Sequence, residues 1–240
     1  APPVARWLDV TVHPKGGQPV NLSSDLLPKA WLLTAGLIYL ALWLWAALGA
    51  DWRGLQRSSY RQHLLFGGAL AVLCLWYLRA GVSPGLGIHL LGMTALTLML
   101  GWRLALVASV VPLIGMVVLG REPWSAAAVS ALLLAAVPVG VTHLVWRVTE
   151  RWMPSNLFAY LFVCAFFGGV LSAALARLLV VGLLVVSGSY DGEQLQREYL
   201  LLLPLTLLPE GMLNGMLVSV MAVYRPDWLA TFDAKRYLRH

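Results

Sequence analysis

Long runs of apolar residues, separated by short polar loops, make up most of the chain. A helix needs about 20 apolar residues to cross the hydrocarbon core of a bilayer. Runs that approach this length are predicted as membrane-spanning helices at residues 31–50, 62–78, 86–100, 104–119, 126–146, 157–186 and 199–224. The pattern predicts an all-α fold, a polytopic transmembrane helical bundle with about seven spans.

Three of these runs depart from the ideal length. The third and fourth runs are short and are joined only by residues 101–103, so they form either a tight helical hairpin or one span and one re-entrant segment. The sixth run is too long for a perpendicular span, which predicts a tilt, a bend at Gly168 and Gly169, or an extension past the membrane.

Composition supports a membrane protein. The chain is 60% hydrophobic and only 12% charged, with a mean hydropathy of +0.76, whereas soluble domains carry about 25% charged residues. The net charge is +6, but the lysines and arginines lie in short loops and do not gather on one face. We therefore expect contact with the lipid bilayer and no nucleic acid partner.

The distribution of basic residues predicts the direction of insertion. Cytoplasmic loops carry an excess of lysine and arginine. A cytoplasmic C-terminus leaves more of these residues inside than outside, with Arg177 left within a span. The predicted organisation is an exterior N-terminal tail (residues 1–30), a transmembrane helical domain (31–224) and a cytoplasmic C-terminal tail (225–240).

A histidine in the third run is the first candidate for function. His89 lies near the outer face, among glycines that allow other backbones to approach closely. Imidazole is a common transition-metal ligand, and Met93, four residues later, would share a helix face with it. The alternative is a histidine that only packs between helices.

The last run holds a second group of polar residues. Glu210 follows Pro209 near the middle of the run, and Asn214 lies one helical turn later. A carboxylate at this depth needs a cation, a proton or a metal ion. Arg177 is expected at a similar depth in the neighbouring span, so an ion pair between Arg177 and Glu210 is one interpretation of this intramembrane polar pair.

The exterior tail offers two further candidate ligands. His13 and Asp25 are predicted on the same side of the membrane as His89, and a tail that folds back over the third run would bring them close. The first 20 residues are polar and lack an apolar core, so no cleavable signal peptide is expected. We find no catalytic motif and no nucleotide-binding motif, so we expect a protein that is not an enzyme and has no nucleotide site.

Two short motifs resemble those of a known transporter family. Residues 87–92, Gly-Ile-His-Leu-Leu-Gly, are similar to the Gly-His-Leu-Leu-Gly motif of the membrane substrate-capture subunits of cobalt and nickel energy-coupling-factor transporters. Glu210 and Gly211 resemble a Glu-Gly pair of that family. The order of features is similar from about Asn21 onward, and the sequence after Pro209 resembles a divergent bacterial branch.

The resemblance implies a function and partners. It implies a bundle of about seven helices in the bacterial inner membrane that captures cobalt or nickel at its outer side, with His89 in the position of the family's metal-binding histidine. It also implies a transmembrane coupling protein and cytoplasmic ATPase subunits of an ABC transporter. The family's N-terminal Met-His has no counterpart near residues 21–26, where only Asp25 is similar.

Three hypotheses remain open from the sequence. The first is a permease subunit for cobalt or nickel ions. The second is a copper-handling membrane protein that uses Met93, with Met212 and Met216 on one face of the last span. The third is a non-transporting membrane scaffold or assembly factor in which the histidine and the polar pair are structural.

Overall fold

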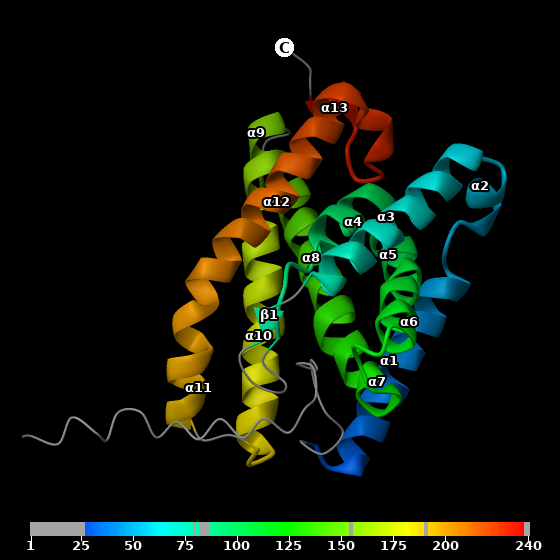
Figure 1. Cartoon of the computed structure of the whole chain (residues 1–240). Coiled ribbons are helices and arrows are strands. Elements are labelled where there is room, and N and C mark those ends of the chain that lie inside the picture. Colours follow the sequence, from blue (N-terminus) through cyan, green and yellow to red (C-terminus); the bar gives the residue numbers. More distant parts are fainter. Residues whose placement is uncertain (1–26, 79, 82–86, 154–155, 190–191, 238–240) are drawn as a thin grey trace, which may run out of the picture.

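The computed structural model of the 240-residue chain describes residues 27–78, 80–81, 87–153, 156–189 and 192–237. Its fold is a helical bundle in which the chain crosses back and forth (Figure 1). The α-helices are α1 (Lys29–Leu48), α2 (Trp52–Gln56), α3 (Ser59–Tyr77), α4 (Met93–Leu100), α5 (Trp102–Ala108), α6 (Val110–Val118), α7 (Trp124–Ser130), α8 (Val137–Trp152), α9 (Leu157–Ala159), α10 (Gly168–Val186), α11 (Gly192–Glu198), α12 (Leu203–Tyr224) and α13 (Ala234–Tyr237).

Several short elements join or interrupt these helices. Two π-helical segments, Ala131–Ala136 and Tyr160–Phe167, lead into α8 and α10, and 3₁₀ turns cover Leu200–Leu202 and Pro226–Trp228. The strands β1 (Ala80–Gly81) and β2 (Gly87–Ile88) form a minimal antiparallel pair. The predicted all-α bundle is therefore confirmed, apart from this two-residue ladder.

Four helices in the described part of the chain are long and apolar enough to cross a membrane. They are Lys29–Leu48, Trp124–Trp152, Leu157–Val186 and Leu200–Tyr224, and a shorter apolar helix covers Trp102–Val118. Large apolar side chains such as Leu33, Leu48 and Val186 are exposed on them, as expected for surfaces that face lipid. The count of seven spans and the direction of the termini stay predictions.

The third predicted run, residues 86–100, is not one continuous helix, because α4 begins only at Met93 and ends at Leu100. Almost every side chain of α4 is buried, so it lies inside the bundle and does not face lipid. The turn at Gly101, which has a φ of 78°, leads directly into α5.

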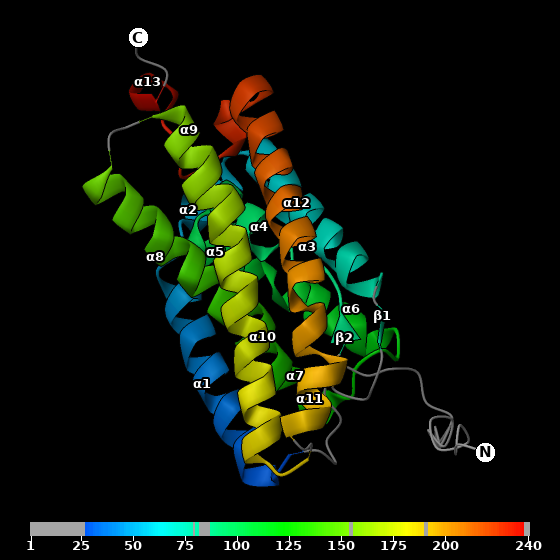
Figure 2. The same ribbon diagram turned by 90° about the vertical axis from the view of Figure 1, so that its left-hand side faces the viewer.

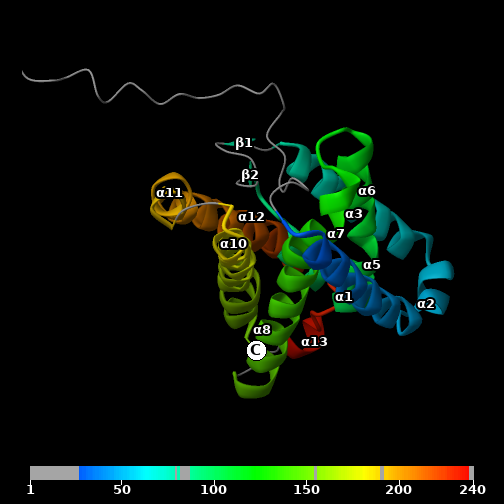
Figure 3. The same ribbon diagram turned by 90° about the horizontal axis from the view of Figure 1, so that it is seen from below.

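The helices around α4 form two groups (Figures 2 and 3). Seen from below, α10, α11 and α12 lie on one side, and α1, α2, α3, α5 and α6 lie on the other. Figure 2 shows α10 and α12 running side by side along the length of the bundle. Helix α4 contacts both groups, since it packs against α3 and α5 as well as α8, α10 and α12.

Glycine permits the close approach of α12 to the sixth predicted span. A β-carbon at Gly211 would lie 2.6 Å from Cγ2 of Val170 and 3.1 Å from the carbonyl oxygen of Phe166. Only a residue without a side chain fits so close to another backbone. The neighbouring residue, Glu210, is thereby placed in the interior, where it is 1% exposed.

Candidate metal-binding loop

The segment from Gly87 to Gly92 enters the bundle as extended chain. It begins as β2, where Ala80 pairs with Ile88 and Gly81 pairs with Gly87. It ends at Gly92, whose φ of 64° is in the left-handed region. Glycine adopts this conformation without steric cost, and a β-carbon there would also lie 2.8 Å from Cδ1 of Leu75. We call residues 89–92 the histidine loop.

Glu210 accepts hydrogen bonds from the end of the histidine loop. Its Oε2 lies 2.6 Å from the backbone nitrogen of Leu91, and its Oε1 lies 2.9 Å from that of Gly92. The side-chain amide of Asn214 donates to the same Oε1 at 2.8 Å. Three donors therefore meet a carboxylate that is buried away from water, which offsets the cost of burying its charge.

The same two side chains cap the start of α4. The first N–H groups of a helix have no partner within it, and the helix dipole favours an anion there. The Oδ1 atom of Asn214 accepts a hydrogen bond from the backbone N–H of Ala95 at 2.8 Å, next to the Glu210 carboxylate. Glu210 and Asn214 lie one turn apart on the same face of α12, since Asn214 also donates to the carbonyl oxygen of Glu210. Their common role is to hold the histidine loop and α4.

Arg177 contacts the histidine loop from the other side. One terminal nitrogen donates to the carbonyl oxygen of His89 at 2.7 Å, and the other donates to Oγ1 of Thr206 at 2.9 Å. The predicted direct ion pair with Glu210 is not formed. Both charged groups bond instead to the backbone of residues 89–92, Arg177 to the carbonyl oxygen of His89 and Glu210 to the N–H groups of Leu91 and Gly92.

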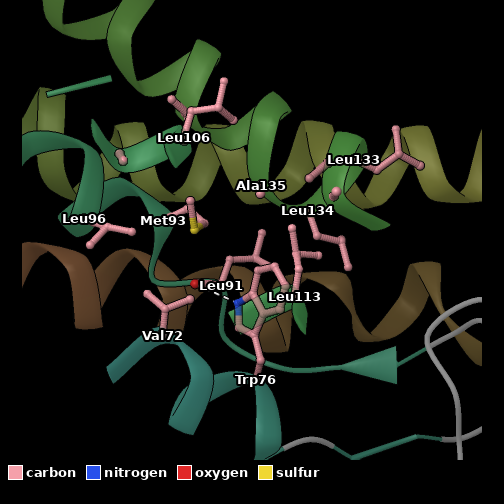
Figure 4. Packing of buried hydrophobic residues seen from close by; sticks show 14 of the residues in the cluster. Val72, Trp76, Leu91, Met93, Leu96, Leu106, Leu113, Leu133, Leu134 and Ala135 are labelled. Atoms are coloured by element: carbon pink, nitrogen blue, oxygen red, sulfur yellow. Dashed lines mark hydrogen bonds between the residues drawn. The ribbon is translucent and has the colours of Figure 1, made fainter. Parts of the chain in front are cut away.

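The indole of Trp76 completes the support of the histidine loop. Its Nε1 donates to the carbonyl oxygen of Leu91 at 3.0 Å, and Figure 4 shows this bond among the surrounding apolar side chains. The Trp76 and His89 rings meet edge to face, with centroids 5.7 Å apart. His89 is 6% exposed. Side chains from α3, α10 and α12 thus fix the backbone that carries this imidazole.

Met93 does not share a helix face with His89. The predicted spacing of one helical turn requires continuous helix, but His89 lies in the loop before α4, which begins at Met93. The Met93 side chain is fully buried in the apolar cluster that also contains Val72, Leu91 and Leu96 (Figure 4). The two methionines of the last helix, Met212 and Met216, are exposed on its surface.

The two predicted ligands of the N-terminal tail, His13 and Asp25, lie outside the described residues. Within the described residues, no three histidine, cysteine, aspartate or glutamate side chains gather closely enough to hold a metal ion. Of the four predicted ligands, His89 and Met93 lie within the described residues.

Sequence reasoning missed several supporting residues. Trp76, Thr206 and the hydroxyl cluster of Thr94 with Thr142 and Ser172 were not expected at the site. A tryptophan or threonine inside an apolar run carries no pattern that assigns it a partner. The glycines at 87 and 92 were the available signal, because they break the helical run at the position where the loop forms.

Apolar helices of membrane length, packed around a buried loop that carries a histidine, define a polytopic membrane protein with a candidate cation-binding loop. Residues 21–228 match the family described as the cobalt uptake substrate-specific transmembrane region, CbiM. The chain belongs to this family and is a membrane protein of transition-metal uptake.

Solved structures share the fold. One, described as the crystal structure of a transition metal transporter, superimposes with a TM-score of 0.71 at 13% identity, covering 85% of this chain and 93% of that chain. A second, described as a truncated transition metal transporter, gives a TM-score of 0.65 at 15% identity, covering 85% of this chain and 99% of that chain. No curated protein matches this chain by sequence.

Proposed function

We propose that the protein is the substrate-capture subunit of an energy-coupling-factor ABC transporter in the bacterial inner membrane, and that it binds a cobalt or nickel ion at its outer side through His89. The observation that carries the proposal is the rigid support of the histidine loop. Arg177, Trp76 and Glu210 hold the backbone on both sides of the imidazole. A ligand held in place before binding loses little conformational entropy when the ion arrives.

The remaining ligands come from the N-terminal tail in this proposal. His13 and Asp25 are the candidates, and oxygen and nitrogen donors both suit divalent cobalt and nickel. The tail precedes α1, which begins at Lys29, and it would cover the histidine loop once the ion is bound. The metal ion is the transported substrate, and the energy for its release inward comes from the coupling protein and the ATPase subunits.

The chemistry of the ligand makes binding depend on pH. An imidazole binds a metal ion only in its neutral form, so protons compete with the ion. Affinity should therefore fall as the pH is lowered and the imidazole becomes protonated.

The test is calorimetric titration of the purified protein in detergent with Co²⁺ and with Ni²⁺. His89→Ala should weaken binding by about 10- to 100-fold or more, since loss of an outer-shell partner alone costs about that much. The matched control is His143→Ala, which removes a histidine on α8 that lies between the rings of Trp102 and Trp146. Equal affinity of wild type and His89→Ala would refute the proposed site.

The tail ligands are tested in the same titration. His13→Ala and Asp25→Ala should each weaken binding, and the double variant should approach the affinity of His89→Ala. If neither Co²⁺ nor Ni²⁺ binds to the wild-type protein at concentrations up to the millimolar range, the scaffold hypothesis replaces metal capture.

A further inference from the structure

Helix α4 is held at both of its ends by side chains and backbone from distant parts of the chain. It has 8 residues, so its length is about 12 Å at 1.5 Å per residue. At its start, Glu210 and Asn214 accept from the backbone N–H groups of Leu91, Gly92 and Ala95. A helix this short depends on such contacts, because isolated helices of this length are unstable.

The C-terminal segment, residues 225–237, holds the opposite end of α4. The backbone N–H of Ala230 donates to the carbonyl oxygen of Met99 at 3.0 Å. Thr231 donates to the carbonyl oxygen of Leu98 twice, from its backbone nitrogen at 3.3 Å and from its hydroxyl at 2.8 Å. The last carbonyl groups of a helix lack partners within it, so these bonds are the C-terminal counterpart of the Glu210 and Asn214 contacts.

Thr231 is itself fixed within the bundle. Its Oγ1 lies 2.7 Å from the hydroxyl of Tyr160, and its carbonyl oxygen accepts from Nε1 of Trp146 at 3.1 Å. The side chain is 9% exposed. The C-terminal segment is therefore fixed relative to α8 and to the π-helical segment before α10. Through its hydrogen bonds to Leu98 and Met99, it also fixes the end of α4.

We infer that α4 acts as a rigid connection through which Thr231 positions the histidine loop. A displacement of the C-terminal segment along α4 should move Gly92, because every residue of α4 except Met99 is buried and the helix packs against α3, α5, α8, α10 and α12. Close-packed interiors transmit such displacements and do not absorb them. Thr231 is thus a positioning residue for metal capture, at the opposite end of α4 from His89.

This inference rests on the proposed function only for its effect on metal affinity. Its structural content is a coupling between residues 230–231 and the backbone of residues 89–95, which exists whether or not a metal ion binds. In the proposed orientation the C-terminal segment faces the cytoplasm, so a partner subunit bound there would change the affinity of the outer metal site through α4.

The experiment compares Thr231→Val with Thr149→Val. Valine has nearly the shape of threonine but removes the hydroxyl. Thr149 is a suitable control because it is also buried and lies near the same end of the bundle, on α8, where its hydroxyl bonds to Cys164. Neither variant changes a predicted metal ligand. The two readouts are hydrogen–deuterium exchange of the amides at residues 89–95 in metal-free protein, and the dissociation constant for Ni²⁺ and Co²⁺.

Thr231→Val should speed exchange at residues 89–95 and raise the dissociation constant, each by about fivefold, the lower range of coupling between sites. Thr149→Val should change neither by more than about twofold, because the Thr149 hydroxyl bonds to Cys164 and not to the end of α4. Thr231→Ser, which keeps the hydroxyl, should restore both values. If Thr231→Val does not fold, Trp146→Phe removes a different hydrogen bond to the same segment and should speed exchange at residues 89–95.

Two results would overturn the inference: unchanged exchange at residues 89–95 in Thr231→Val, or equal acceleration in the two threonine variants. The exchange readout also separates this inference from the proposed function. If the wild-type protein binds neither Ni²⁺ nor Co²⁺, the metal-capture proposal fails, and the exchange rates alone decide whether α4 connects Thr231 to the histidine loop.

Discussion

The Oε1 atom of Glu210 lies 2.9 Å from the backbone nitrogen of Gly92, although the two residues are 118 positions apart in the chain. This contact joins the two motifs that resemble the transporter family, and it does so through the backbone of the histidine loop. A buried carboxylate that accepts several hydrogen bonds can fix a loop without touching the ion that the loop binds. Glu210 therefore supports the loop, and in the proposed function His89 binds the ion.

Replacing Glu210 with glutamine should destabilise the protein and weaken metal binding. The amide keeps the shape of the carboxylate, but only one of its two terminal atoms is an oxygen that accepts hydrogen bonds. The backbone N–H of Leu91 or of Gly92 therefore faces an NH₂ group and loses its acceptor. A buried donor left without an acceptor costs about 1–3 kcal/mol. Thermal unfolding in detergent measures the loss. The control is Glu193→Gln, at an exposed position of α11, and equal unfolding temperatures for the two variants would contradict the role of Glu210.

Alanine at Gly92 should be more costly than alanine at Gly140. Gly92 has a φ of 64°, and a β-carbon there would lie 2.8 Å from Cδ1 of Leu75. The left-handed conformation alone costs about 1–2 kcal/mol for a residue with a side chain. Gly140 lies within α8 with open space around it, so alanine there should stabilise the helix by about 0.5–1 kcal/mol.

Urea unfolding followed by circular dichroism distinguishes the two glycine variants by the sign of their effect. Because Gly92 ends the histidine loop, Gly92→Ala should also weaken Ni²⁺ binding, whereas Gly140→Ala should leave it unchanged. A Gly92→Ala variant as stable as the wild type would mean that the loop adopts another conformation.

Much of the bundle could be predicted from hydrophobic pattern, and the histidine loop could not. Apolar runs identified the long helices, since length and composition decide membrane insertion. The run at residues 86–100 has the same composition but forms a loop and a half-helix, because Glu210, Asn214 and Arg177 supply hydrogen bonds that a continuous helix would not need. These contacts come from residues more than 80 positions away, and a local pattern does not contain them.

The polar pair illustrates the same limit. Counting residues along the spans predicted that Arg177 and Glu210 lie at a similar depth in the membrane. In the structure both side chains bond to the same loop. Opposite charges at one depth favour an ion pair when nothing lies between them. The sequence did not reveal that a backbone segment separates the two side chains, so it predicted the neighbourhood of these residues but not their partners.

Asp51 should titrate below the ordinary range of an aspartate. The backbone N–H of Gly54 and then the Arg61 guanidinium, each 2.9 Å from a carboxylate oxygen, lower the pKa of Asp51. A lowered pKa in the folded state means that the contribution to stability is present above the unfolded value of about 3.9 and is lost as the pH falls through the folded pKa.

Carbon-13 NMR of the aspartate carboxyl groups measures the titration of Asp51 directly. Arg61→Met should move the midpoint of Asp51 upward, toward the ordinary value, because it removes one of the groups that favour the charged form. Since Asp51 caps the start of α2, the amide exchange of α2 should quicken over the same pH range in the wild type. A midpoint that Arg61→Met leaves unmoved would show that the Asp51–Arg61 contact is absent in solution.

Trp76 should report metal binding through its fluorescence. Its ring centroid lies 5.7 Å from that of His89, and its Nε1 donates to the carbonyl oxygen of Leu91 at 3.0 Å. Co²⁺ and Ni²⁺ have open d shells and quench an indole that lies close to them. A metal ion on the His89 imidazole should therefore quench Trp76 more strongly than other tryptophans of the chain.

The comparison is between Trp76→Phe and Trp52→Phe, each titrated to saturation with Ni²⁺. Trp76→Phe should lose most of the metal-dependent quenching, and Trp52→Phe, at a partly exposed position outside the bundle interior, should retain it. Trp76→Phe also removes one hydrogen bond to the histidine loop, so its affinity should fall about two- to twelvefold, equivalent to about 0.5–1.5 kcal/mol. Undiminished quenching in saturated Trp76→Phe would place the bound ion away from His89.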